Sequence, residues 1–138
     1  MTLKRTTKRL DLTHVAVEVS RMGSSKHAYK ATFIIDINIF ESIAPAAELR
    51  KVGIEPQGKQ AYELPTGELL EYEYAFVELR FLDEVNIARI LFGPDDAAPC
   101  LGRLALNAAG FIVDLKSQTI TKLSARPLKK SAKIALAR

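Results

Sequence analysis

The chain has 138 residues, enough for one domain with one hydrophobic core and too few for two domains of ordinary size. Hydrophobic residues make up 48% and charged residues 26%, a balance that excludes an intrinsically disordered chain and predicts a globular one. The formal net charge is +4, and its excess of basic residues lies at the two ends: Lys4, Arg5, Lys8, Arg9, Arg126, Lys129, Lys130, Lys133 and Arg138. We therefore expect a basic N-terminal segment over 1–12, a folded domain over 13–124 and a basic C-terminal tail over 125–138.

Short cationic ends usually serve solubility, so binding of nucleic acid or of an acidic partner through counterion release is the weaker interpretation of them. One cysteine, Cys100, excludes an internal disulfide, and its apolar neighbours predict a small buried side chain. His14 and His27 have no cysteine or carboxylate around them at metal-ligand spacing, so we expect no metal and no cofactor. No signal peptide and no membrane-spanning run is recognisable, which predicts a cytoplasmic protein without membrane contact.

The first elements in chain order form a predicted β-hairpin. Val15, Val17 and Val19 alternate with other residues, the period of a half-buried strand that begins near Thr13. A polar turn over 21–26 leads into a second strand that ends at Ile35. Asp36 follows directly, so its carboxylate is expected to project from the end of a rigid element.

The middle of the chain predicts a short helix and a second hairpin. The helix covers Pro45–Val52, because proline is tolerated in a first turn and Gly53 is a natural stop. Pro65, Thr66 and Gly67 form a turn between two extended runs, the pattern of a hairpin that could act as a flap. After Leu70 the apolar positions change phase near Phe76, which predicts a β-bulge there.

The last third of the chain alternates predicted strands with one short helix. The strands are expected over 85–92, 111–114 and 119–123, and the helix over 103–109 with Gly110 as its stop. Many short strands, two short helices and no internal repeat together predict a mostly β, barrel-like domain.

Several of these segments resemble one family in order and spacing from about His14 to about Leu123. The segments are Phe33–Pro45, Leu49–Pro56, Cys100–Arg103 and Leu106–Asp114, and they resemble the single-domain, retroviral-type (retropepsin-like) aspartic proteases of bacteria. Ser42-Ile43-Ala44-Pro45 is similar to the Ser-apolar-apolar-Pro that follows the family's catalytic loop. The resemblance implies a mostly β acid-protease barrel with one or two short helices and one lobe per chain.

The same resemblance implies roles for individual residues. Asp36 takes the catalytic position, while Ile37, Asn38 and Ile39 stand where the family has Thr-Gly-Ala. Pro65-Thr66-Gly67 corresponds to the tip of the flap, and Leu101-Gly102-Arg103 is similar to the Leu-Gly-Arg that opens the helix supporting the catalytic loop. Read without the family, Asp36 is a turn-forming acid whose carboxylate accepts local backbone amides.

The implied activity is peptide-bond hydrolysis by a homodimer, because the reaction uses two carboxylates that share a proton and each chain supplies one. The partners would be a second copy and a peptide or protein substrate. Ile37 removes a hydroxyl and Asn38 adds a side chain in the catalytic loop, so we expect hydrolysis to be weak or lost. The alternative is a non-catalytic peptide-binding or dimerisation module on the same fold.

Overall fold

The structure is a computed structural model that describes residues 7–10, 13–24 and 26–123. The expected tail over 125–138 and most of the expected segment over 1–12 lie outside the described residues, although Thr7–Leu10 of that segment forms strand β1. The described chain is mostly β, as predicted, with two six-residue helices, α1 (Ala46–Lys51) and α2 (Arg103–Ala108).

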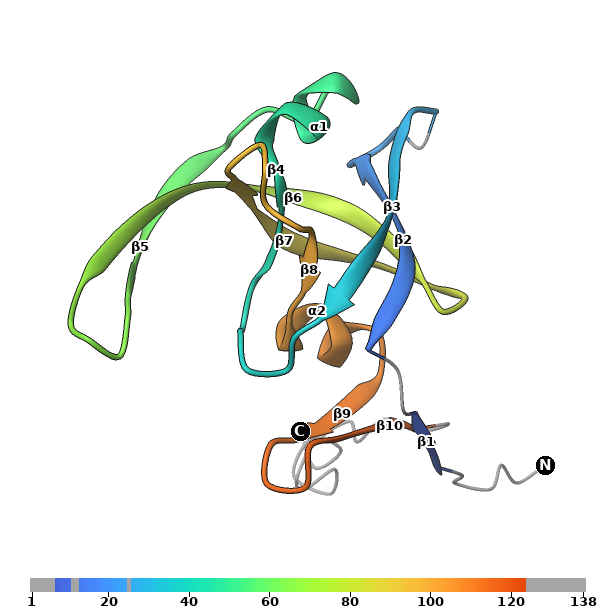
Figure 1. Cartoon of the computed structure of the whole chain (residues 1–138). Coiled ribbons are helices and arrows are strands. Elements are labelled where there is room, and N and C mark those ends of the chain that lie inside the picture. The colour runs from blue at the N-terminus through green and yellow to red at the C-terminus, as the bar shows by residue number, and fades with distance from the viewer. Residues whose placement is uncertain (1–6, 11–12, 25, 124–138) are drawn as a thin grey trace, which may run out of the picture.

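Seven strands form one large sheet in the order β2-β3-β8-β4-β7-β6-β5 (Figure 1). Their bounds are β2 His14–Arg21, β3 Ala28–Ile35, β4 Ser42–Pro45, β5 Gly58–Glu63, β6 Leu69–Phe81, β7 Glu84–Gly93 and β8 Cys100–Leu101. Strand β2 also pairs with β6, from Glu18↔Arg80 to Arg21↔Val77, so the sheet closes on itself. Closure leaves β5 outside the ring, where it continues as the free arm of a hairpin with β6.

A smaller sheet of order β1-β10-β9 lies at one end of this ring (Figure 1). It contains β9 (Phe111–Asp114) and β10 (Thr119–Leu123), with Thr7–Leu10 pairing along β10. Phe111 stacks on Phe81 of the large sheet at 6.3 Å between ring centroids, and Lys122 forms an ion pair with Glu84. These contacts join the two sheets around one continuous core.

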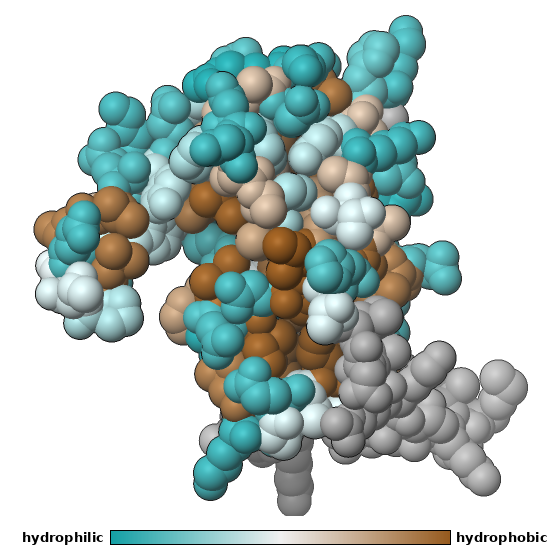
Figure 2. All heavy atoms as spheres, in the orientation of Figure 1, coloured by the Kyte–Doolittle hydropathy of each residue, from teal (hydrophilic) through white to brown (hydrophobic). Residues whose placement is uncertain are grey.

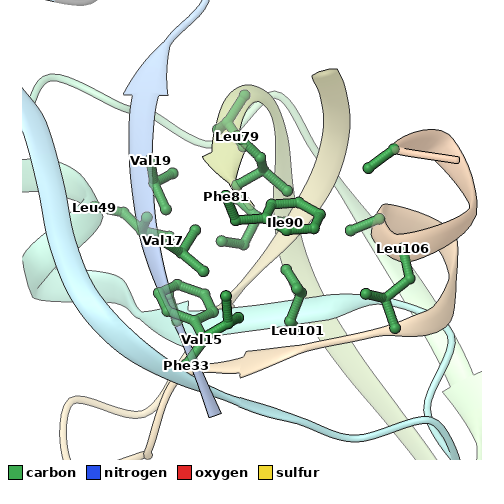
Figure 3. Close-up of a cluster of buried hydrophobic side chains, with 14 of the residues drawn as sticks. Val15, Val17, Val19, Phe33, Leu49, Leu79, Phe81, Ile90, Leu101 and Leu106 are labelled. Atoms are coloured by element: carbon green, nitrogen blue, oxygen red, sulfur yellow. The ribbon is translucent and has the colours of Figure 1, made fainter. Parts of the chain in front are cut away.

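The core consists of the inward-facing residues of the ring and of the helices that close it (Figure 3). Val15, Val17 and Val19 are all buried, as their alternation predicted. Other fully buried side chains come from distant segments: Phe33, Leu49, Val77, Leu79, Ile90, Leu101 and Leu106. Because β3 is part of this core up to Phe33, the residues that follow it begin from a fixed position.

The bulge predicted near Phe76 is absent from β6. Its pairing with β7 keeps one register from Tyr74↔Leu91 to Phe81↔Glu84. Ala75 and Val77 face the core, whereas Phe76 is exposed on the other face. Both faces of β6 therefore carry apolar side chains near Phe76. In the sequence, the alternation of one face ends where that of the other begins, and this pattern also predicts a bulge.

Candidate functional site

The loop that follows β3 carries Asp36 between two fixed points. The Asp36 backbone N–H donates to the Leu101 carbonyl at 3.0 Å, which continues the parallel pairing of β3 with β8. The Asp36 carboxylate oxygen Oδ1 accepts the Asn38 backbone N–H at 3.0 Å. Asp36 is partly exposed, so its carboxylate is held by a local turn while one side remains open to a ligand.

The three residues after Asp36 differ in burial. Ile37 is only 8% exposed and belongs to the hydrophobic core, so this position offers no hydrogen-bond donor on its side chain. Asn38 is exposed, and it is not among the described residues that have positive φ. The turn therefore needs no left-handed residue at Asn38, and the backbone amide at this position still reaches the carboxylate. Ile39 is partly buried.

The N-terminus of α2 donates hydrogen bonds to the loop that follows Asp36. The Arg103 N–H donates to the Ile39 carbonyl and the Leu104 N–H to the Phe40 carbonyl, both at 3.0 Å. The Gly102 N–H donates to Oγ of the buried Ser42 at 3.0 Å. No side chain caps α2, so the loop supplies acceptors to amides that would otherwise be unsatisfied at a helix start. Leu101, Gly102 and Arg103 thus contact the loop that carries Asp36.

Gly102 lies so close to this loop that no side chain fits. A Cβ at this position would lie 2.5 Å from the Phe40 carbonyl oxygen and 2.6 Å from that of Glu41. The next residue, Arg103, places its guanidinium over the Phe40 ring at 4.1 Å from the centroid. The backbone of 39–41 and the start of α2 therefore form one packed unit.

The hairpin of β5 and β6 carries Pro65, Thr66 and Gly67 at its exposed tip. The Gly67 N–H donates to the Leu64 carbonyl at 2.8 Å, and Gly67 has a φ of +88°, which explains the glycine. Figure 2 shows the tip as a separate lobe at the left, with an open gap between it and the rest of the surface. No hydrogen bond within the described chain joins the tip to residues 36–39.

The hairpin reaches the loop through Glu41 instead, a residue that sequence reasoning missed. The Tyr62 hydroxyl on β5 donates to Glu41 Oε2 at 2.7 Å, and Arg89 on β7 lies 3.5 Å from the same oxygen. The Glu41 side chain is 11% exposed, and the Arg89 guanidinium also lies over the Tyr74 ring at 4.3 Å from its centroid. These groups are 21 and 48 residues from Glu41 in sequence, so no local pattern could pair them.

Two pKa shifts follow from this contact. Burial raises the pKa of the Tyr62 hydroxyl, and its hydrogen bond to Glu41 adds to the rise. The pKa of Arg89 is also raised, first by its hydrogen-bonding contact with Tyr62 and then by the Glu41 charge, against the effect of burial. Both shifts keep the proton on the group that donates it, so the link between hairpin and loop is stable at neutral pH.

Cys100 pairs with Ile34 of β3, two residues before Asp36. Its side chain is partly exposed rather than buried as predicted, although β8 lies between β3 and β4 in the sheet. Burial raises the pKa of the Cys100 thiol and the Asp36 carboxylate adds to the rise, so the reactive thiolate is disfavoured.

Residues 7–10, 13–24 and 26–123 meet the requirements of neither a metal site nor a membrane-spanning helix. No group of three or more His, Cys, Asp or Glu side chains there could hold a metal ion. In the same residues, no helix has the length and apolarity that crossing a bilayer requires. Among the sequence-predicted site residues, Asp36 is the one that brings an ionisable side chain to the loop after the core strand β3.

Comparison with known proteins gives no family assignment. No protein-family model matches the chain, and no curated protein sequence matches it.

Proposed function

We propose that this chain is a retropepsin-like aspartic endopeptidase homologue that works as a homodimer. Extended peptide would lie between the loop 36–41 and the hairpin of β5 and β6. The observation that carries the proposal is the support of the Asp36 loop by the first amides of α2, below a projecting hairpin. This arrangement holds the backbone around Asp36 in place, which a catalytic carboxylate requires.

Two copies are required because the chemistry uses two carboxylates. In a two-fold dimer, the two Asp36 carboxylates would lie side by side and share one proton. Two neighbouring carboxylates repel each other when both are ionised, so one of them keeps its proton. The ionised carboxylate would remove a proton from the attacking water, and the protonated one would polarise the scissile carbonyl. The Asn38 amide, 3.0 Å from Asp36 Oδ1, would help to keep that oxygen in place.

Hydrolysis by this dimer would be slow. Ile37 faces the core and gives no hydroxyl to link the two loops, and the exposed Asn38 side chain occupies space beside the carboxylate. These two features favour the second candidate function, a non-catalytic module that binds peptide by main-chain pairing. Both functions would use the same hairpin and the same loop for peptide binding, and turnover distinguishes them.

The deciding experiment is a mass-spectrometric cleavage assay on a diverse peptide pool over about pH 3 to 7, where a carboxylate dyad changes its protonation. The purified protein is compared with its Asp36→Asn variant, and sedimentation of both samples reports the oligomeric state. New termini that depend on Asp36 support the peptidase. A folded dimer that binds peptides without new termini supports the binding module, and a strictly monomeric protein contradicts the peptidase.

Placing the family's residues at positions 37 and 38 tests whether Ile37 and Asn38 cause the slow hydrolysis. The double substitution Ile37→Thr and Asn38→Gly is expected to raise cleavage at least about tenfold, because it returns a hydroxyl and frees space beside Asp36. The matched control is Ile39→Ala, which completes the family's residues at a position that offers no polar group. No gain in a folded dimer would show that the loop is not the cause of slow hydrolysis.

Two further expectations stay predictions. The cytoplasmic location rests on the sequence alone.

Binding of nucleic acid or of an acidic partner by the basic ends would appear as affinity that falls steeply with salt, and binding that is insensitive to salt would contradict it.

A further inference from the structure

A second surface site lies where the β2–β3 turn meets the end of α1. The pocket there has a volume of about 250 Å³ and is lined by Arg21, Ser24, His27, Lys51, Val52 and Gly53. In Figure 1 this junction is at the end of the barrel opposite α2 and the small sheet. It is therefore separate from the loop that carries Asp36.

Every ionisable residue that lines this pocket is basic. Arg21 and His27 come from the β2–β3 segment and Lys51 from α1, so the fold brings the three together from distant parts of the sequence. Within the described chain, the side chains of Arg21 and His27 have no hydrogen-bond or ion-pair partner, and neither has the Ser24 hydroxyl. Arg21 and Lys51 bring two positive charges to the pocket, and Glu48 is the one ion-pair partner that the described residues give them, so an entering anion would be attracted.

Side chains rather than backbone amides would recognise the ligand. The Val52 N–H already donates to the Leu49 carbonyl, and the Gly53 N–H donates to the Arg50 carbonyl. Lys51 has one partner, Glu48 at 3.1 Å, and both side chains of this pair are largely exposed, so the pair is weak and Lys51 can turn to another anion. An arginine fork, a lysine and a hydroxyl are the donors that suit an anion with several oxygens.

We propose that the pocket of Arg21, Ser24, His27 and Lys51 binds a small oxyanion of the phosphate type. Its volume is below the range of about 300–1,000 Å³ that drug-sized ligands occupy, which fits a phosphate group and not a larger molecule. The site does not depend on the peptidase proposal, because its lining residues do not include Asp36, Glu41 or any residue at the tip of the β5–β6 hairpin.

The experiment is a titration of the full chain with inorganic phosphate, followed by amide NMR shifts and by calorimetry, at constant ionic strength set with chloride. We expect saturable shifts at the amides of Ser24, His27 and Gly53, with a Kd of about 1 mM or tighter. Shifts that chloride reproduces at equal ionic strength, or no saturation below about 10 mM phosphate, would overturn the proposal.

Two variants are expected to change the Kd in opposite directions, and a third serves as a control; Arg21 and Lys59 are exposed and Glu48 is partly exposed, so we expect all three variants to fold. Arg21→Gln is expected to weaken phosphate binding at least about fivefold by removing charge-assisted hydrogen bonds. Glu48→Gln is expected to tighten binding about twofold or more, since it frees Lys51 and removes a negative charge nearby. The matched control is Lys59→Gln on the distant β5, which should leave the Kd unchanged. Equal effects of Arg21→Gln and Lys59→Gln would show non-specific charge attraction and overturn the site.

Discussion

Gly102 shows how one residue can determine the geometry of the candidate site. Its φ is −95°, so the requirement is not for a left-handed backbone conformation. The requirement is space, because the carbonyls of Phe40 and Glu41 occupy the position of any Cβ. Backbone atoms cannot rotate away as a side chain can, and the start of α2 donates two hydrogen bonds to the loop 39–41 and a third to Ser42 directly after it. A larger residue here must displace the loop that carries Asp36.

We therefore predict that Gly102→Ala lowers the free energy of unfolding by about 2–4 kcal/mol through this overlap. Urea denaturation followed by circular dichroism gives the value. Gly58→Ala is the matched control, since its Cβ would meet only the movable end of Tyr74, and it should cost less than about 1 kcal/mol. Equal costs for the two glycines would contradict the argument.

Asn86 is a second residue whose environment has a measurable consequence. Both polar atoms of its side-chain amide are buried, and neither has a hydrogen-bond partner in the part of the chain that the structure describes. A buried, unsatisfied amide loses its interaction with water and gains nothing in return, so an apolar side chain of similar size is better suited to the position.

Asn86→Leu is accordingly expected to raise the free energy of unfolding by about 1–2 kcal/mol, measured as an increase in the denaturation midpoint at constant slope. The exposed Asn107 provides the comparison, because Asn107→Leu should change stability by less than about 0.5 kcal/mol. A loss of stability in Asn86→Leu would show that the amide has a structural role.

At the scale of elements, the hairpin of β5 and β6 makes two side-chain contacts with distant segments, Tyr62 with Glu41 and Glu73 with Arg50 of α1. It lies beyond the closed ring of strands, and its tip is exposed. Tyr62 of β5 donates to Glu41, and Arg89 of β7 contacts the same Glu41 oxygen. We therefore expect the loss of the Tyr62 hydrogen bond to loosen the hairpin more than the barrel.

Tyr62→Phe should free this hairpin without changing the barrel. We expect backbone amides at Tyr62 and Leu64 to exchange at least about fivefold faster, because the loss of a hydrogen bond to a charged group is worth about 1–3 kcal/mol locally. Amides of the core strand, such as that of Val77, should keep their protection. Tyr72→Phe is the control on the same hairpin, since its hydroxyl has no partner in the described residues. If Tyr72→Phe accelerates exchange equally, the contact with Glu41 is not the anchor.

For the whole molecule, the raised tyrosine pKa values connect folding with pH. Burial raises the pKa of Tyr29 above its usual 10.0, with the Glu48 charge adding to it, and Tyr62 is raised as well. The folded state then binds these protons more tightly than the unfolded state. Their contribution to stability is complete below pH 10 and is lost as the pH rises through the higher folded values.

This linkage predicts that the denaturation midpoint falls as the pH is raised above about 10, and that the fall is shallower in Tyr62→Phe. Absorbance of tyrosinate in the folded protein should also show a late-titrating component that Tyr29→Phe and Tyr62→Phe each reduce. A midpoint that falls with the same slope in the variant and the original protein would contradict the role of Tyr62.

Much of the fold follows from local patterns in the sequence. The alternating valines of β2, the helix stop at Gly53 and the turn at Pro65–Gly67 all appear where their residue types predict them. Proximity in space is harder to predict. Asp95 accepts the Ala47 amide of α1 at 3.0 Å although 48 residues separate them, and the β6–β7 turn uses Leu82 and Asp83 at positive φ without any glycine. Leu82 packs against the core, and that burial offsets the strain of its conformation.

The sequence by itself determined the elements, the mostly β class and the position of Asp36 at the end of a strand, because hydrophobic period and turn residues act over a few neighbours. Only the tertiary structure decided that β2 closes the ring on β6, that Glu41 links the loop to Tyr62 and Arg89, and that Arg21, His27 and Lys51 line one pocket. Those relations depend on how distant strands pack around one core, and a one-dimensional pattern carries no record of which distant side chains will meet.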